Sequence, residues 1–322
     1  VPANAPVINN NNIAGRDINP VTYQGMRLSA LYQINDDWNI LLAQSYQNMD
    51  SEGVFYQMPN SSDGAPLQPR EVTLFNNAYN KDKFENTAWT VNGKIGFLKA
   101  VSTGAYLVRH VNQVGDYTNY ARGVYADYYQ CVGPSAGNPS TCYSPSAIWQ
   151  EQERNEHMSH EFRLSTPDDL RVRGIVGAFY ETNKLFDQTD WSYKNVPTCT
   201  SSVPGSPGDT GCFANVGTVP GTTVENPGVR NDNVAFFEDD TRNLKQTAFF
   251  GSIDVDLIPK VLTLTAGTRH YSFDNSFKGS VASSFGCFQA GVPAGGCLAG
   301  SSRRPAGGGR RHAARRAGRQ GL

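Results

Sequence analysis

The chain has 322 residues, with 28 basic and 29 acidic side chains and a formal net charge of −1. Its mean hydropathy is −0.46, and no stretch reaches the roughly 18 apolar residues that a membrane-spanning helix needs. This excludes a helical membrane protein. A membrane β-barrel stays possible, because its strands alternate apolar and polar residues and average to a middling hydropathy.

Alternation with a period of two residues is typical of β-strands and recurs along the chain. In Gly25–Ile34, for example, Met26 and Leu28 fall on one face and Arg27 on the other. The clearest alternation lies in the last hairpin. The pattern predicts strands over 25–34, 38–49, 88–97, 102–111, 160–165, 173–182, 247–257 and 261–273. No segment has the pattern of an amphipathic helix.

The connections between these strands alternate in length. Short turns near 35–37, 98–101, 166–171 and 257–260 alternate with long segments near 50–86, 113–156, 184–245 and 274 onward. Four long structureless loops would be unusual in a compact soluble domain. An outer-membrane barrel has short turns at one end and long loops at the other. We therefore predict an all-β fold, an antiparallel up-and-down transmembrane β-barrel slice of about eight strands from a larger barrel.

Six cysteines fall in three close pairs, all in the long loops. They are Cys131 and Cys142, Cys199 and Cys212, and Cys287 and Cys297. No CxxC motif or histidine at ligand spacing accompanies them, so we expect no zinc site and no other metal. We predict three local disulfides and an oxidising compartment. Six free thiols in a cytosolic protein are the alternative, and other pairings stay open.

The last twenty residues differ from the rest of the chain. Residues 303–322 hold seven arginines and no acid, which leaves residues 1–302 with a formal charge of −8. We interpret this Arg/Gly/Ala-rich tail as a translated frameshift, and we expect it to be disordered. The alternative is an arm that binds nucleic acid or anionic lipid. We expect no nucleic-acid partner.

Two hairpins resemble those of TonB-dependent outer-membrane receptors. One runs from Thr247-Ala-Phe-Phe-Gly-Ser-Ile-Asp-Val-Asp256 into Leu262-Thr-Leu-Thr-Ala-Gly-Thr-Arg269-His-Tyr271. The other joins His160-Glu-Phe-Arg-Leu-Ser-Thr-Pro167 to Gly174-Ile-Val-Gly-Ala-Phe-Tyr-Glu181. The resemblance covers roughly residues 20–275. It implies a 22-stranded barrel, plugged by an N-terminal domain, that imports scarce nutrients with energy relayed by TonB.

The chain departs from the family pattern, because we find no plug, no TonB box and no terminal aromatic strand. We therefore expect a central slice of the barrel, with TonB coupling supplied by a missing N-terminal region of the parent protein. The predicted organisation is a leading loop over 1–19, a partial barrel over 20–275, a disulfide-bearing loop over 276–302 and the tail over 303–322.

The sequence offers no catalytic constellation, so we expect no enzyme and no cofactor. His157 and His160 would point to opposite faces of a strand, and the acidic run Glu238-Asp239-Asp240 is expected in a solvated loop. The predicted lumen carries charged residues whose main role would be mutual pairing and contact with a plug. They are Arg27, Glu161, Arg163, Arg173, Glu181, Asp254, Asp256 and Arg269.

A tyrosine-rich segment before Cys131 is the candidate substrate-binding site. Tyrosine offers a flat apolar face and a polar tip, which suits ligand capture at a barrel mouth. An aromatic girdle or loop packing is the alternative. The candidate residues are Tyr117, Tyr120, Arg122, Tyr125, Tyr128 and Tyr129.

The resemblance implies a receptor for a ferric siderophore, cobalamin or oligomeric breakdown products. The expected location is the Gram-negative outer membrane, with outer-membrane lipid, TonB and a small-molecule substrate as partners and with the long loops outside. The alternative is a secreted all-β adhesin or carbohydrate-binding protein that is stabilised by disulfides in its loops. A sandwich would bury Met26, Ile95 and Leu264 between two sheets, whereas a barrel would turn its apolar residues toward lipid.

Overall fold

The structure, a computed structural model, describes residues 8–53, 57–61, 64–121, 130–132, 141–143, 146–194, 223–225, 230 and 234–283. A short helix, α1 (Thr118–Ala121), follows β4. In these ranges no helix is long and apolar enough to cross a membrane. The strands are β1 (Val21–Gln33), β2 (Asn39–Glu52), β3 (Tyr79–Ile95), β4 (Leu98–Asp116), β5 (Gln130–Val132), β6 (Thr141–Tyr143), β7 (Ala147–Ser165), β8 (Val172–Tyr193), β9 (Val234–Ile258) and β10 (Leu262–Ser283).

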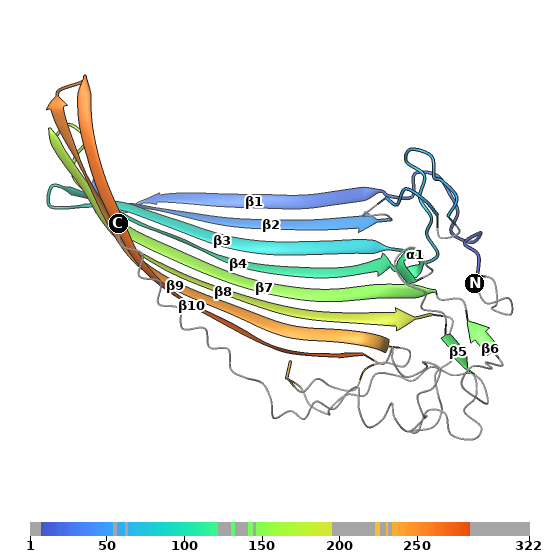
Figure 1. Cartoon of the computed structure of the whole chain (residues 1–322). Helices are drawn as coiled ribbons and strands as arrows, with labels where there is room; N and C mark the ends of the chain where they lie inside the picture. The colour runs from blue at the N-terminus through green and yellow to red at the C-terminus, as the bar shows by residue number, and fades with distance from the viewer. Residues whose placement is uncertain are drawn as a thin grey trace.

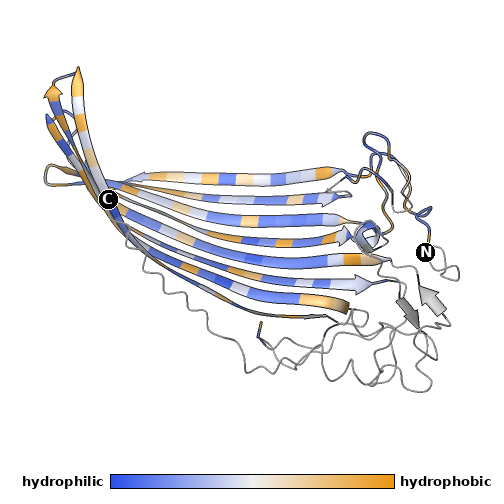
Figure 2. Ribbon diagram, viewed as in Figure 1, coloured by the Kyte–Doolittle hydropathy of each residue, from blue (hydrophilic) through white to orange (hydrophobic). Residues whose placement is uncertain are grey.

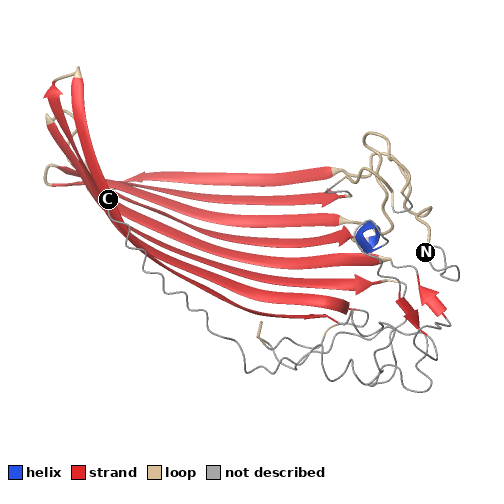
Figure 3. Ribbon diagram, in the orientation of Figure 1, coloured by secondary structure: helices blue, strands red, loops and turns tan. Residues whose placement is uncertain are grey.

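Eight strands form one antiparallel sheet in the order β1-β2-β3-β4-β7-β8-β9-β10, while β5 and β6 form a separate pair. Each strand of the large sheet therefore lies beside its neighbours in the chain, and the sheet is strongly curved (Figure 1). The four short connections all lie at one end, and strand dominates the described chain (Figure 3). The predicted all-β, up-and-down architecture is confirmed.

The short turns are staggered from strand to strand. Following paired residues across the sheet, Asn39 at the start of β2 lies level with Val101 of β4. That level reaches β10 at Arg269, so Leu262 at the start of β10, six strands away from β2, lies seven residues beyond it. With ~3.4 Å per residue and ~4.8 Å between strands, this stagger corresponds to a strand tilt of about 40°. Membrane barrels have strands tilted by roughly 35–45°.

Register also sorts the side chains onto two faces, because directly paired residues point the same way. Hydrophobic and hydrophilic residues alternate along the strands (Figure 2). On one face, which we call the band face, apolar residues line the turn half of the sheet. They include Met26, Leu28, Leu42, Ile95, Phe162, Val176, Phe249, Ile253 and Leu264.

These apolar side chains are exposed rather than packed between sheets. Met26 is 67% exposed, Ile95 51% and Leu264 59%. On β8 the apolar stretch of the band face runs from Val172 to Tyr180, which spans about 30 Å along the strand. At the tilt given above, this is about 22 Å along a barrel axis, close to the ~25 Å apolar band of membrane barrels. The burial expected of a sandwich is absent from the described sheet.

The strands are longer than the alternation predicted. β3 begins at Tyr79, β7 at Ala147 and β9 at Val234, all inside segments predicted as long loops. β10 likewise continues through 276–283, which had been assigned to the disulfide-bearing loop. The loop halves of the strands carry polar residues on both faces, so pairing with neighbours, and not amphipathic alternation, extends them.

One short turn was also misplaced. The turn predicted at 98–101 lies at Gly96-Phe97, and residues 98–101 already belong to β4. Gly96 adopts a φ of 63°, in the left-handed region that glycine tolerates without a steric penalty.

The Trp89 side chain on β3 depends on a glycine in the neighbouring strand. A Cβ at Gly104 of β4 would lie 2.5 Å from the Trp89 ring and 2.7 Å from the Ser159 carbonyl oxygen. The ring centroid of Trp89 lies 5.9 Å from that of His160 on β7. The indole therefore crosses β4 over the space that the missing side chain leaves.

We predict that Gly104→Ala destabilises the sheet by about 1–3 kcal/mol, because ring and backbone must both shift. Gly174→Ala is the matched control, since a Cβ there would meet nothing closer than the Ser252 carbonyl oxygen at 3.7 Å. Denaturant unfolding of both variants in detergent measures the difference. Equal stabilities would contradict the prediction.

Candidate functional site on the opposite face and at the loop end

The face opposite the band face carries the charged residues predicted to line a lumen. Register places all of them there, in line across the strands, as with Arg173 opposite Asp254 and Thr263 opposite Asp256. The members are Arg27, Glu161, Arg163, Arg173, Glu181, Asp254, Asp256 and Arg269. The prediction that they share one face is confirmed.

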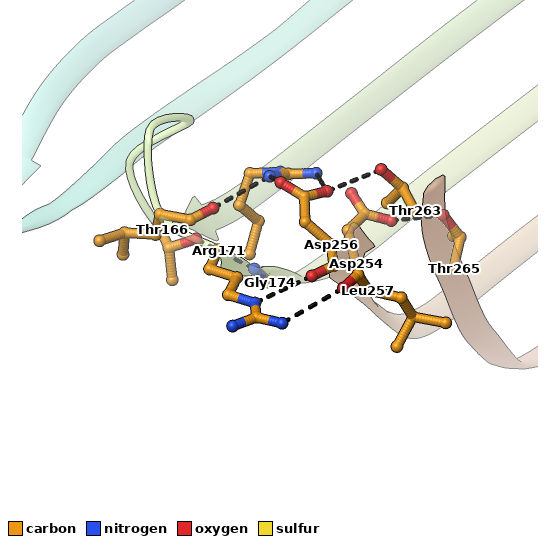
Figure 4. Close-up of polar contacts among 10 residues, drawn as sticks. Thr166, Arg171, Gly174, Asp254, Asp256, Leu257, Thr263 and Thr265 are labelled. Carbon is orange, nitrogen blue, oxygen red and sulfur yellow. Dashed lines mark hydrogen bonds and ion pairs between the residues drawn. The ribbon is translucent and has the colours of Figure 1, made fainter. Parts of the chain in front are cut away.

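At the turn end, Arg173 and Asp256 form a two-pronged ion pair. The guanidinium nitrogens Nη1 and Nη2 donate to Asp256 Oδ2 and Oδ1 at 2.7 and 2.9 Å. Figure 4 shows the hydrogen bonds that Thr263 and Arg171 add to Asp256. The hydroxyl of Thr263 donates to the same carboxylate at 2.6 Å, and Thr265 donates to Asp254 at 2.6 Å. Arg171 donates to the Asp256 carbonyl oxygen at 2.9 Å, so three strands are linked below the turns.

Of the other charged residues on this face, some form ion pairs as expected, and Arg269 forms a contact of a different kind. Arg163 Nη1 lies 3.2 Å from Glu161 Oε1, and His157 Nε2 lies 2.8 Å from Glu181 Oε1. The Arg269 guanidinium instead lies over the Phe179 ring, 5.2 Å from its centroid. His160 points to the band face, where its Nε2 lies 2.9 Å from Ser102 Oγ, so the two histidines are on opposite faces as predicted.

Toward the loops, the opposite face becomes acidic. Glu153, Asp187 and Asp240 lie directly opposite one another on β7, β8 and β9. Arg242 lies 3.1 Å from Asp240. Arg109 on β4 forms an ion pair with Asp82 on β3. Within the described chain, no three acidic, histidine or cysteine side chains converge enough to hold a metal ion. This surface can attract cationic groups.

The acidic run Glu238-Asp239-Asp240 is part of β9, not of the loop in which it was expected. Asp239 pairs with Arg230, whose guanidinium also lies 3.1 Å from Asp190. Successive residues of the run therefore lie on opposite faces, because strand pairing continues through it.

A buried polar cluster closes the loop end of the sheet. Asp116 is 3% exposed and accepts hydrogen bonds from the Phe75 amide at 2.6 Å, Asn76 Nδ2 at 3.0 Å and the Thr118 hydroxyl at 2.7 Å. Asn76 Nδ2 also donates to Ser146 Oγ at 3.1 Å. The cluster thus joins the segment before β3, the end of β4, α1 and the start of β7.

No pattern in the sequence predicts the whole of this cluster, although part of its signal is local. Asp116 precedes Thr118 by two residues, the spacing at which an aspartate caps a helix start. The contacts with Asn76 and Ser146 join residues 40 and 70 positions apart, which no local pattern reveals.

Two of the predicted substrate-binding tyrosines lie beside this cluster in an aromatic group. The centroid of the Tyr117 ring lies 4.6 Å from that of Tyr120 and 4.7 Å from that of Trp191, and the Tyr117 ring is edge-on to the indole. Burial and the neighbouring Tyr120 raise the pKa of the Tyr117 hydroxyl, so it stays neutral. These contacts give the two rings a packing role at the loop end. Arg122, Tyr125, Tyr128 and Tyr129 lie outside the described residues.

One predicted cysteine pair lies on paired strands. Cys131 of β5 is directly opposite Cys142 of β6. Such positions have Cα atoms roughly 4.5–5.5 Å apart, within the range a disulfide requires. This backbone arrangement is compatible with the predicted bridge. Cys199, Cys212, Cys287 and Cys297 lie outside the described residues, so those pairings stay predictions.

Searches against known proteins give limited similarity. No protein-family model matches the chain, and no curated protein sequence matches it. Among solved structures, it is similar to the siderophore receptor PiuA from Acinetobacter baumannii, with a TM-score of 0.40 and 11% sequence identity. The alignment covers 83% of this chain and 40% of that receptor, so the chain spans less than half of the receptor's length. This degree of similarity does not assign a family.

We predict that Asp116→Ala destabilises the loop end by about 2–4 kcal/mol, because the Phe75 and Thr118 amides, the Thr118 hydroxyl and Asn76 Nδ2 all lose the carboxylate that accepts from them. Asp50→Ala is the control, since Asp50 is half-exposed and lies 3.8 Å from Lys81. Limited proteolysis should cut the Asp116→Ala variant faster within residues 64–76 and spare the control. Unchanged cleavage in both would contradict the prediction.

Proposed function

We propose that the chain forms part of the wall of a TonB-dependent outer-membrane receptor that imports a scarce nutrient. The observation that carries this proposal is the band face, whose apolar residues are exposed and span about 22 Å at a barrel-like tilt. Water would penalise such a surface, whereas lipid would cover it. In lipid, strands also satisfy their backbone hydrogen bonds only through pairing, as the eight strands do here.

The face opposite the band face supports the proposed import of a nutrient. Its ion pairs at the turn end and its carboxylates toward the loops make it a polar wall, suited to a lumen that holds a plug and passes a substrate. A ferric siderophore, cobalamin or an oligomeric breakdown product is the substrate class we propose. TonB would act through a plug region of the receptor outside this chain.

Orientation follows from the connections. The short turns would face the periplasm, and the long connections, with the paired Cys131 and Cys142 positions, would face the medium, where disulfides form readily. The tyrosine segment from Tyr117 to Tyr129 would lie at the outer mouth, and its role in substrate binding stays a prediction.

Substitutions at two neighbouring residues of β8 test whether the sheet forms a wall in a membrane. Val176 lies in the apolar band, and Ile175 points to the opposite face. We predict that Val176→Lys lowers the free energy of unfolding in lipid bilayers by about 2–4 kcal/mol, and that Ile175→Lys costs clearly less. In a secreted, water-exposed sheet, Val176→Lys would be harmless because Val176 is 59% exposed. That result would rule out the membrane wall.

Import is tested in cells. Deletion of the gene should abolish growth on one of the three nutrient classes when that nutrient is limiting, and the gene should restore growth. Uptake of the labelled nutrient should stop in a strain without TonB, while its binding to the cell surface remains. Energy-independent uptake, or normal growth after deletion on all three classes, would contradict the receptor proposal.

A further inference from the structure

A cavity at the loop end lies outside the curved sheet, between two segments that are distant in the chain. One wall is the segment 10–19, which leads into β1, and the other is formed by residues 57 and 69–74 of the connection between β2 and β3. Figure 1 shows both segments at the end of the sheet opposite the short turns. The cavity measures about 1090 Å³, which is large enough for a drug-sized ligand.

The first wall lies directly on the end of β2. The Glu52 amide donates to the carbonyl oxygen of Pro20, just after this wall, at 3.0 Å. Gly53 adopts a φ of 92°, and a Cβ there would lie 2.1 Å from the carbonyl oxygen of Ile18, which lines the cavity. Only a residue without a side chain permits this approach. The first wall is therefore fixed to the sheet.

The second wall is held by the buried polar cluster. Asn119 Nδ2 donates to the Thr73 carbonyl oxygen at 2.7 Å, and the Phe75 amide donates to Asp116 at 2.6 Å. Both walls are thus fixed to the end of one sheet. The distance between them is set by the fold, so the cavity is formed before any ligand binds.

Each wall carries an arginine that is followed by an acidic residue. Arg16 and Asp17 lie on one wall, Arg70 and Glu71 lie on the other, and all four line the cavity. None of the four forms an ion pair with a described residue. Glu71 Oε2 instead accepts a hydrogen bond from the Gln68 amide at 2.8 Å. The two guanidinium groups and the Asp17 carboxylate are therefore available to a ligand that carries both charges.

The backbone of each wall is strained at one of these residues. Asp17 adopts a φ of 53° and Arg70 a φ of 69°, in the left-handed region that residues other than glycine rarely occupy. In the described part of the chain, only Lys260 in the turn after β9 shares this feature. Such strain persists where the surrounding structure imposes it, and it is concentrated at ligand sites. Its presence on both walls of one cavity agrees with a binding role.

The other lining residues indicate the chemistry of the ligand. Asn10, Asn19 and Gln57 supply amides that can donate to and accept from peptide groups. Ile13 and Leu74 supply apolar surface. A guanidinium binds a carboxylate through two parallel hydrogen bonds, and a carboxylate binds an ammonium group. A short peptide with free ends combines all of these features.

We propose that this cavity binds a short peptide, with its terminal carboxylate bound by Arg16 and Arg70 and its amino group bound by Asp17. The inference rests on the proposed function in one respect, namely that the bound peptide is the imported nutrient. It then selects the oligomeric breakdown product from the three nutrient classes. Binding itself requires only the two walls.

The test uses the full chain, purified in a neutral detergent and titrated in a calorimeter with a tetrapeptide of alanine and leucine. The peptide with free ends should bind. Amidation of its carboxyl end or acetylation of its amino end should each weaken binding at least about tenfold, because a charged hydrogen-bonding group is lost. Absence of binding, or equal binding of the blocked peptides, would overturn the proposal.

Variants of the walls locate the site. Arg16→Gln and Arg70→Gly should each weaken binding of the free peptide at least about fivefold. Glycine suits the φ of 69° at position 70, so this variant loses the guanidinium without added strain. Arg154→Gln on β7 is the matched control, an exposed arginine outside the cavity, and should change affinity less than about twofold. Unchanged affinity in both wall variants, with native circular-dichroism spectra, contradicts the assigned site.

Failure of the proposed function would be seen separately from failure of this inference. In the first case, Val176→Lys would leave stability in bilayers unchanged while the free tetrapeptide still bound. In the second case, the tetrapeptide would not bind, while Val176→Lys still destabilised the protein in bilayers and cells still imported another nutrient class.

Discussion

The register between neighbouring strands is the constraint on which the other features of this molecule depend. Backbone pairing fixes which residues lie side by side, and a slip of one residue would exchange the two faces of a strand. Val176 would then leave the apolar band, and Arg173 would lose its position opposite Asp254. The same register carries the stagger that tilts the strands. Face, tilt and ion pairs are thus consequences of one set of hydrogen bonds.

The turn half of the sheet could be predicted from the sequence because both required signals are local. Apolar and polar residues alternate there, as in Gly25–Ile34, and the turns that join the strands are short. The loop half gives neither signal. Around Lys81, Asp82 and Lys83, both faces are polar, so the strand is recognisable only from its pairing with β2 and β4. The contacts of Asp116 with Phe75 and Asn76 likewise join segments that are distant in the chain.

The arrangement of the charged residues could likewise be predicted only where it depends on local spacing. That Glu161 and Arg163 share a face follows from their spacing of two residues, and the structure adds that they form an ion pair. The positions of Lys83 and Lys184 three strands apart could not be predicted, because more than a hundred residues separate them in the chain. Tyr117 and Tyr120 show a further limit. Composition indicated an aromatic site, whereas their packing on Trp191 depends on where β8 ends.

The length of β9 has a consequence for the exposure of the proposed barrel wall. Its 25 residues measure ~85 Å along the strand and roughly 60 Å along a barrel axis at this tilt. Since the apolar band takes up only about 25 Å, more than half of the wall would stand clear of the bilayer as a rigid collar. An antibody or a phage could reach that collar without touching lipid.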